Sequence, residues 1–214
     1  FYPETGRFKN YSVNAQRSNS LSSDYILCIN ELDERTLILG TLKQGIDLFD
    51  KRTETFRNIK IPNNRSDLSD NNIYAIYKDL SDSVWIATLS NLYFFDAKKT
   101  SFTEVQGVRS VKCIDQHSKS GGLWFGTRFN GLINFKGSET RFFERADSQN
   151  SISSNHITSL CFESDSLLWV GTSDGLNLLN VETRQIISWF ENDGLPSNKI
   201  SAIEIDASGL LWIS

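Results

Sequence analysis

The sequence of 214 residues is poor in the residues that build most catalytic and metal sites. It contains two histidines, three cysteines and no methionine. Three scattered cysteines are too few for the disulfide framework of a small secreted domain. The two histidines, His117 and His156, leave no credible Ser-His-Asp or Cys-His arrangement. We therefore expect no catalytic residues, no metal site and no cofactor in this chain.

Long apolar runs and an excess of basic residues are also missing. No apolar run approaches the roughly 20 residues that cross a bilayer as a helix, and the opening FYPETGRFKN lacks the basic-then-apolar pattern of a secretory signal. Any targeting segment is therefore expected outside this chain. The formal net charge of −4 disfavours nucleic-acid binding, which requires a basic surface.

What the sequence does contain is a repeat. The segment LLWVGTSDGLNLLN (167–180) has counterparts in LWFGTRFNGLINF (123–135), VWIATLSNLYFF (84–95) and LILGTLKQGIDLF (37–49). The residue two positions before the small residue–threonine pair recurs at intervals of 47, 39, 45 and 43 residues. Its five copies are Ile38, Trp85, Trp124, Trp169 and Trp212. A period of about 40 to 50 residues is typical of a propeller blade or of a helical-repeat unit.

The pattern inside each unit decides between these two architectures. Each unit holds four strand-length runs of β-branched and aromatic residues, separated by turn residues about every ten positions. No window shows a sustained apolar period of 3.6 residues, which disfavours helical repeats. Four strands per unit, repeated around an axis, predict an all-β fold made of β-propeller blades with four antiparallel strands each.

Small and turn-forming residues recur within the units and predict how the blades are built. An Asp or Asn two residues before the first strand of every unit except the one containing Trp124 is expected to bond backbone amides and close the turn. Small residues on the first strand suit crowding at the axis, and those two residues after the tryptophan position suit a spot where a neighbouring backbone or aromatic ring lies close. In the following turn Asn91 replaces the glycine of the other units, which predicts the same positive-φ turn in all four. The first-strand set is Cys28, Ala75, Ser110, Ser159 and Ala202, and the second-strand set is Gly40, Ala87, Gly126, Gly171 and Ser214.

The unit boundaries predict about four complete blades and two partial ones. The complete blades are assigned to residues 15–60, 61–106, 107–147 and 148–192. Residues 1–14 are assigned to the last strand of a preceding blade, and residues 193–214 to the first two strands of a further blade. A fifth blade made from the two ends would lack its third strand and expose an unpaired edge. We therefore expect a fragment of a six- to eight-bladed ring rather than a closed five-bladed one.

These units resemble the two-component regulator propeller repeat, whose pattern is LPSNxIxxIxxDxxGxLWIGTxxGLxxFDxxTxxFxxY. The segments ISSNHITSLCFESDSLLWVGTSDGLNLLNVETRQI (152–186) and GLPSNKISAIEIDASGLLWIS (194–214) match it closely. The resemblance extends over essentially the whole chain and is weakest across 103–147. It implies the periplasmic sensor region of bacterial hybrid two-component system histidine kinases, anchored in the inner membrane.

The same resemblance implies a function and partners. Such propellers sense oligosaccharides and regulate glycan-utilisation genes, and the histidine kinase lies elsewhere in the parent chain. The implied partners are an oligosaccharide, a neighbouring propeller or immunoglobulin-like domain of the same chain, and a second receptor copy in a homodimer. Two other hypotheses stay open. One is a lyase or hydrolase that acts on glycans through paired rim carboxylates, and the other is a protein-interaction propeller without a small ligand.

Several conspicuous residues are interpreted as structural. The tryptophan series is expected to pack between blades, and the cysteines to be buried small side chains at non-equivalent positions. The two histidines are expected in solvated loops at opposite rims. Asp50, Asp96 and Asn180 share the slot after the third strand, which indicates turn capping rather than acid–base catalysis.

Ligand-binding residues are expected where the repeats differ, on one rim of the propeller. This rim is predicted to combine the turns between second and third strands with the links from fourth strands to the next blade. Arg128 and Phe129 pair a guanidinium fork for a carboxylate or sulfate with a ring for the apolar face of a sugar. The turn candidates are Lys43, Gln44, Ser90, Asn91, Arg128, Phe129, Asn130, Ser173 and Asp174, and the link candidates are Arg65, Arg109, His156, Trp189 and Lys199.

Overall fold

The computed structural model describes residues 4–62, 71–136, 139–146 and 150–214, which form antiparallel sheets almost without helix. Four four-stranded sheets and a two-stranded one succeed each other along the chain. The first sheet contains β1 (Ile26–Glu31), β2 (Thr36–Thr41), β3 (Ile46–Asp50) and β4 (Thr55–Ile59). The second contains β5 (Ile73–Lys78), β6 (Val84–Thr88), β7 (Leu92–Asp96) and β8 (Ser101–Val105). The third contains β9 (Val111–Gln116), β10 (Leu123–Thr127), β11 (Leu132–Lys136) and β12 (Glu139–Phe143).

The fourth sheet contains β13 (Ile157–Phe162), β14 (Leu167–Thr172), β15 (Gly175–Asn180) and β16 (Ile186–Trp189). A short 3₁₀ turn, η2 (Glu191–Asp193), leads to the two-stranded sheet of β17 (Ile203–Ile205) and β18 (Leu211–Ile213). Within each four-stranded sheet the strands pair in sequence order. This is the predicted meander of a propeller blade.

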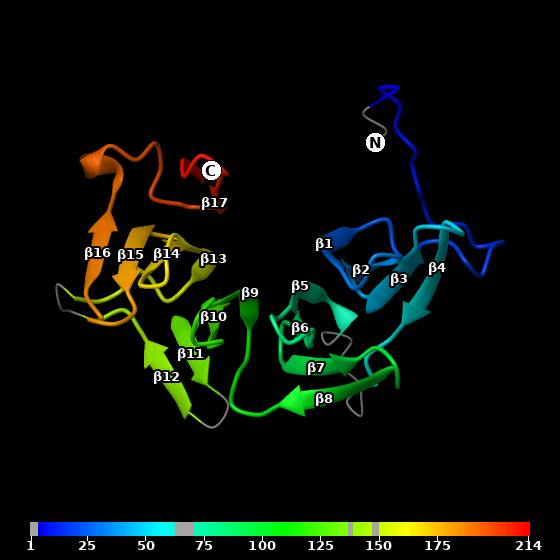
Figure 1. Ribbon diagram of the computed structural model, residues 1–214, viewed down its shortest axis with the longest axis horizontal. Helices are drawn as coiled ribbons and strands as arrows, with labels where there is room; N and C mark the ends of the chain where they lie inside the picture. The colour runs from blue at the N-terminus through cyan, green and yellow to red at the C-terminus, as the bar shows by residue number, and fades with distance from the viewer. Residues whose placement is uncertain (1–3, 63–70, 137–138, 147–149) are drawn as a thin grey trace.

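The sheets follow one another around an open arc (Figure 1). The first strands β1, β5, β9 and β13 lie on the inner side of this arc, and the last strands β4, β8, β12 and β16 lie outside. The prediction of all-β propeller blades is confirmed, and the described residues form no closed ring. Residues 4–12 contain no strand and lead away from the first sheet. Their assignment to a preceding blade, like the blade boundaries, stays a prediction.

Adjacent blades meet most closely at the glycine that follows the tryptophan position. A Cβ atom on Gly126 would lie 2.6 Å from Cγ2 of Ile157, the first residue of the next inner strand, and would also collide with Cys113 Sγ. Gly40 and Gly171 are approached in the same way by Ile73 and Ile200 of the following blade. The second sheet has alanine in this slot, and its neighbours are correspondingly smaller: Ala75 across the strand pair and Val111 in the next blade. The close neighbour in the next blade is therefore its leading aliphatic side chain, and the expectation of a backbone or an aromatic ring was wrong.

Strand register corrects the sequence alignment in the third blade. Cys28 pairs with Gly40, and Cys113 pairs with Gly126. The small first-strand residue of the third blade is thus Cys113, not Ser110, and two of the cysteines occupy equivalent positions rather than different ones. The alignment was wrong because this blade lacks the sequence that precedes β1, β5 and β13. Burial at these positions raises the pKa of both thiols to about 12.

The links between blades are fastened by the predicted Asp and Asn residues. Each side-chain Oδ1 accepts a hydrogen bond from a backbone N–H, as expected, but the donor lies seven to eleven residues earlier, near the start of the link. The Asx residue therefore closes the whole link rather than only the turn into the strand. The pairs are Val13 N to Asp24, Ile61 N to Asn71, Arg145 N to Asn155, and Glu191 N to Asn198, at 2.6 to 3.0 Å.

The turns between second and third strands are not all alike, contrary to prediction. Asn91 does not adopt positive φ, unlike Gly45, Gly131 and Gly175. Its side chain is buried, and Nδ2 donates to Tyr93 Oη at 3.1 Å, so tertiary packing rather than backbone freedom explains this asparagine. All four turns are instead closed by the buried threonine that ends the second strand. Its Oγ1 donates to the carbonyl at the glycine or Asn91 position at 2.8 to 3.1 Å.

The tryptophans pack between blades as predicted. The Trp85 ring centroid lies 6.1 Å from those of Phe125 and Phe135 in the next sheet. Trp124 lies 6.4 Å from Phe162 of the fourth sheet. The indole N–H of Trp85, Trp169 and Trp212 also donates to an acidic side chain six residues earlier, at 2.8 Å in each case. The acceptors are Asp79, Glu163 and Asp206, so the acid at the first turn orients the ring.

The carboxylates after the third strand cap turns, as interpreted. Asp50 Oδ1 accepts from two backbone N–H groups, and Asp96 and Asn180 repeat this pattern. At Asp96 these hydrogen bonds lower the pKa of the carboxyl group, and the one from the Lys99 amide has the largest effect. The residue at this position after the third strand therefore has a structural role in each of these blades.

The glycine contact makes a prediction about stability. Gly126→Ala should destabilise the protein by about 1–3 kcal/mol, because the new methyl group overpacks against Ile157 and Cys113. The triple variant Cys113→Ala/Gly126→Ala/Ile157→Val reproduces the side chains of the second blade and should recover most of this loss. Urea unfolding followed by circular dichroism measures both. A triple variant no more stable than Gly126→Ala would show that steric fit does not set this residue.

The tryptophan contact makes a second prediction. Trp124→Ala should cost about 3–5 kcal/mol, because its side chain is almost fully buried between the third and fourth sheets. Trp212 occupies the same repeat position but is 62% exposed, so Trp212→Ala in the 214-residue chain should cost about 1 kcal/mol or less. Equal losses for the two variants would contradict this assignment of energy to interblade burial.

Candidate functional site

The predicted rim exists, because turns and links bond directly to one another. Arg128 N donates to Ser110 O at 2.9 Å, which joins the β10–β11 turn to the link before β9. Ser173 N donates to His156 O at 3.0 Å in the same way in the fourth blade. These turns and links therefore form one continuous rim, which we call the 2–3 rim after the strands that its turns connect.

A β-bulge near the start of each inner strand gives this rim its variable inner side chains. Register shifts leave Leu27, Tyr74, Lys112 and Thr158 without a strand partner. Bulges re-aim side chains and recur next to functional sites. The four bulged residues share no chemistry, although the positions on either side of them repeat. The inner end of the 2–3 rim is thus where the blades differ most.

A small cavity of about 150 Å³ opens at this place. Bulged residues Tyr74 and Lys112 line it, with Arg128 from the β10–β11 turn and His156 from the link before β13. The wall is completed by Leu89, Ser110 and Val111. Three successive blades therefore contribute to one cavity, which we call the axial cavity.

Positive charge concentrates around the axial cavity. Lys112, Arg128 and Lys199 all lie close enough to lower the pKa of His156, although desolvation is the larger cause. No carboxylate within the described ranges forms an ion pair with any of these three cations. His156 Nε2 is buried and has no hydrogen-bond partner among the described residues. The cavity therefore offers unused donors and positive potential, a combination that suits an anionic group.

Four predicted candidates lie at or near this cavity, and His156 is one of its lining residues. Arg128 lines it, and its guanidinium carbon lies 5.3 Å from the ring centroid of Phe129, over the ring face. The Phe129 side chain is 62% exposed and so presents an apolar surface beside the cavity. Lys199 contributes through its charge on His156. Asn130 follows in the same turn and is exposed, with its backbone N–H bonded to Thr127 Oγ1 at 2.8 Å.

The other candidates are elsewhere or engaged in packing. Lys43 and Gln44 belong to the first blade's turn, where Lys43 N bonds Asn72 Oδ1 at 2.8 Å. Asp174 forms an ion pair with Arg145 at 3.7 Å. Trp189 packs against Trp169 with ring centroids 5.4 Å apart, which indicates a structural role. Arg65 lies outside the described residues.

Sequence reasoning missed Tyr74 and Lys112, although the signal is present. Both stand on an inner strand between two positions that are repeated in every blade. The position between them is not repeated, since the first blade has Leu27 there and the fourth has Thr158. A regular strand would point such residues away from the small residue at the axis. The bulge changes that direction, and it is not visible in the alternation of residue types.

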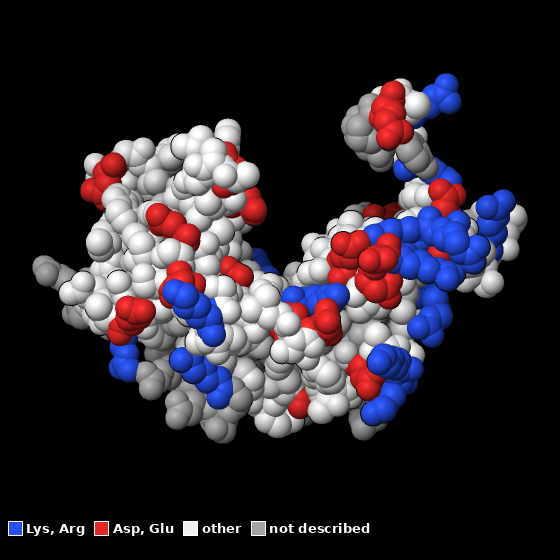
Figure 2. All heavy atoms as spheres, viewed as in Figure 1, with Lys and Arg blue, Asp and Glu red and all other residues white. Residues whose placement is uncertain are grey.

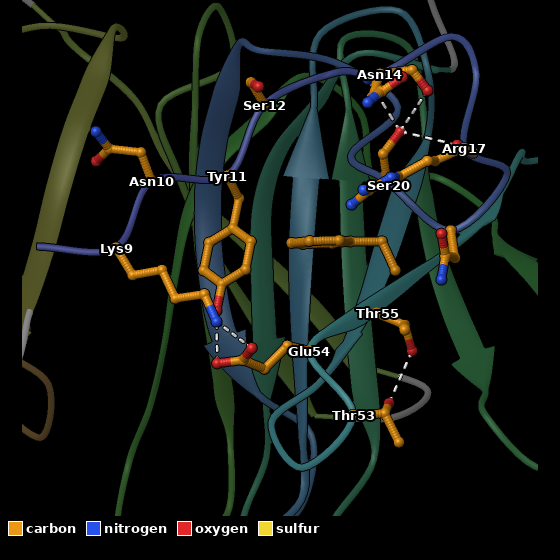
Figure 3. A pocket seen from close by; sticks show the side chains of 12 residues that line it. Lys9, Asn10, Tyr11, Ser12, Asn14, Arg17, Ser20, Thr53, Glu54 and Thr55 are labelled. Carbon is orange, nitrogen blue, oxygen red and sulfur yellow. Dashed lines mark hydrogen bonds and ion pairs between the residues drawn. The ribbon is translucent and has the colours of Figure 1, made fainter.

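Two further cavities are described, and the larger lies on the outer side of the first sheet. Its volume is about 460 Å³, and segment 9–20 and the start of β4 line it. Figure 3 shows Lys9 and Tyr11 directed at Glu54, and Ser20 directed back at the backbone of its own loop. Because these polar groups are already paired with one another, this cavity offers little for ligand recognition.

The described residues offer neither a metal-binding cluster nor a membrane-spanning helix. Within the described residues no cluster of three or more His, Cys, Asp or Glu side chains could hold a metal ion. The described part of the chain likewise contains no helix long and apolar enough to span a membrane. Acidic and basic side chains are interspersed around the hollow of the arc (Figure 2).

Comparison with known proteins agrees with this architecture. Residues 151–174 match the family model described as "Two component regulator propeller". The chain is 36% identical over 179 residues to "Histidine kinase P4" of Formosa agariphila, an alignment that covers 75% of this chain and 12% of that protein. The chain therefore spans only a small part of this relative.

Solved structures with the same fold include extracellular sensor domains. The extracellular domain of the putative one component system BT4673 from B. thetaiotaomicron superimposes with a TM-score of 0.72 and 19% identity, covering 91% of this chain and 27% of that one. The extracellular domain of the putative hybrid two component system BT3049 from B. thetaiotaomicron superimposes with a TM-score of 0.59 and 20% identity, covering 99% of this chain and 33% of that one. The repeat pattern, the blade geometry and the matched family model together show that this chain is a β-propeller segment built from two-component regulator propeller repeats.

Proposed function

We propose that this chain is part of the extracytoplasmic ligand-sensing propeller of a hybrid two-component receptor, and that it binds an oligosaccharide through the axial cavity. The observation that carries the proposal is the cavity itself. Within the described ranges Lys112, Arg128 and the nearby Lys199 form no ion pair, and the buried Nε2 of His156 has no hydrogen-bond partner. Such a site favours a glycan that bears a carboxylate or sulfate. The similarity to extracellular domains of two-component systems supports the setting.

The chemistry of recognition divides between two neighbouring side chains. The Arg128 guanidinium would hold the anionic group in a bidentate manner, and Lys112 and Lys199 would add charge. The exposed Phe129 ring would pack against the apolar face of an adjoining sugar. The remaining rim candidates in the same turns would contact further sugar units. A cavity of about 150 Å³ accepts the charged group rather than a whole oligosaccharide.

Signalling would depend on differential binding. A ligand shifts a two-state receptor only as far as it binds one state better than the other. Because the blades are held by close interblade packing, we propose that the ligand changes how this propeller packs on a neighbouring propeller or immunoglobulin-like domain, within a homodimeric receptor in the inner membrane. The regulated genes would serve glycan utilisation. Catalysis would belong to a histidine kinase elsewhere in the parent chain.

Thermal unfolding of the intact extracytoplasmic region against neutral, carboxylated and sulfated oligosaccharides tests this proposal. A ligand at about 100 times its Kd should stabilise the protein by about 2.7 kcal/mol, which raises the Tm by several degrees. Acidic glycans should give this shift, and Arg128→Ala should abolish it. Phe129→Ala should reduce it.

Arg109→Ala is the matched control. Arg109 is an exposed arginine of the same rim that does not line the axial cavity, so its removal should leave the shift unchanged. A flat response of well-folded protein to every glycan would sink the oligosaccharide proposal and favour a protein-interaction propeller. Turnover of a glycan by the purified protein would instead favour the lyase or hydrolase hypothesis.

The pKa of His156 provides a local reporter of the site. Desolvation and the nearby cations lower the pKa of His156 below its ordinary value of 6.5, so the native state favours neutral imidazole. This preference contributes stability above pH 6.5 that is lost as the pH falls through the lowered pKa, because the unfolded chain takes up the proton first. An NMR titration should show this pKa rising in Arg128→Ala and in Lys112→Ala.

Sulfate provides the corresponding ligand test. A bound anion favours imidazolium, so sulfate should raise the His156 pKa, and sulfate affinity should increase as the pH falls below 6.5. Arg109→Ala should leave both effects in place. A His156 titration curve that does not respond to sulfate would contradict anion binding at the axial cavity.

A further inference from the structure

A second cavity lies between the third and fourth blades, at the rim opposite the axial cavity. Its volume is about 330 Å³, within the range of small-molecule sites. The third blade contributes Trp124, Asn134 and Phe143, and the β15–β16 turn of the fourth contributes Val181, Glu182 and Arg184. In an antiparallel meander this turn lies at the end opposite the β10–β11 turn that carries Arg128. We call it the interblade cavity.

Asn134 breaks the repeat where the chain otherwise places an apolar residue. It pairs with Trp124 across β10 and β11, and the residues in the same register opposite Ile38, Trp85 and Trp169 are Leu48, Phe94 and Leu178. In the second blade this partner packs on the tryptophan, with the Trp85 and Phe94 rings 6.2 Å apart. An amide at this position gives up that apolar contact. Packing within the blade therefore does not explain Asn134.

The Asn134 amide is also unpaired. The residue is 6% exposed, and its Nδ2 is buried without a hydrogen-bond partner in the described part of the chain. A buried donor without a partner is costly, and native proteins rarely retain one without a use. Because the side chain lines the interblade cavity, an acceptor oxygen of a bound molecule could satisfy it.

The surroundings indicate what kind of molecule fits. Trp124, Phe143 and Val181 form an apolar wall. Lys136 and Arg184 are exposed, line the cavity and have no ion-pair partner within the described ranges. Glu182 adds one carboxylate to the lining against these two cations, so the cavity keeps a net positive charge. This lining matches a ligand with an apolar ring face and a negatively charged acceptor.

His117 belongs to the fixed part of this wall. It is buried, contrary to the expectation of a solvated loop histidine. Its Nδ1 accepts from Ser120 N at 2.9 Å, and its Nε2 contacts the Asp165 carbonyl of the fourth blade. Both ring nitrogens are therefore engaged, and His117 joins the two blades instead of offering a ligand contact.

We propose that the interblade cavity is a second binding site, for a ring-shaped organic carboxylate. The ring lies against Trp124 and Phe143, Asn134 Nδ2 donates to an oxygen of the ligand, and Lys136 and Arg184 face its carboxylate. A small aromatic acid and a sugar acid share this chemistry. The site shares no lining residue with the axial cavity and does not depend on the function proposed for it.

Isothermal titration calorimetry of the intact protein with benzoate and with glucuronate tests the proposal. At least one should bind with a millimolar or lower Kd, and the tighter of the two identifies the source of the ligand. Benzyl alcohol, which keeps a ring but lacks the carboxylate, should bind about tenfold more weakly or not at all. Asn134→Leu restores the residue of the first and fourth blades and should weaken binding about tenfold or more while raising the Tm.

One arginine variant and one lysine variant distinguish binding at the interblade cavity from general charge effects. Arg184→Ala should weaken binding about tenfold. Lys119→Ala should leave binding unchanged, because Lys119 is paired with Asp165 and does not line the cavity. The proposal is overturned if neither carboxylate binds, if benzyl alcohol binds as well as benzoate, or if Asn134→Leu is more stable yet binds normally. Arg128→Ala should remove any glucuronate binding at the axial cavity and leave binding at the interblade cavity in place, which keeps the two tests distinct.

Discussion

The structure depends on how closely one blade can approach the next at the axis. The leading aliphatic residue of each inner strand occupies the space that a Cβ atom would take in the preceding blade. Where this leading residue is isoleucine, the preceding blade has glycine, and where it is the smaller Val111, the preceding blade has alanine. This contact brings the inner strands together. Moving outward, the sheets diverge enough for tryptophan and phenylalanine rings to fill the gap.

The repeated residues all serve this arrangement. The buried threonine closes the turn between second and third strands, the Asx residue fastens the link, and the acid at the first turn holds the indole of the tryptophan. These hydrogen bonds satisfy backbone and side-chain groups of the turns and links, and the threonine bond does so in a fully buried position. Repetition of these groups therefore reports on architecture and carries little information about ligands.

Polar and charged side chains that do not serve the blade architecture lie where the repeat is interrupted. Around the axial cavity these interruptions are Lys112, Arg128 and His156, and in the interblade cavity the interruption is Asn134. In both places a buried nitrogen lacks a hydrogen-bond partner among the described residues, and nearby cations form no ion pair there. The rigid repeat can tolerate such groups because neighbouring interblade contacts compensate for their cost.

The sequence alone determined the four-stranded unit, its repetition, the interblade tryptophans and the rim that carries Arg128 and Phe129. These follow from local periodicity and from composition at fixed positions, which the chain states several times. The tertiary structure decided the register of the third blade, the bulges that direct Tyr74 and Lys112 into a cavity, and the conformation of Asn91. It also decided that Asn134 is buried without a partner. Such features depend on strand pairing and on how side chains pack in three dimensions, and no alternation of residue types along a single strand records them.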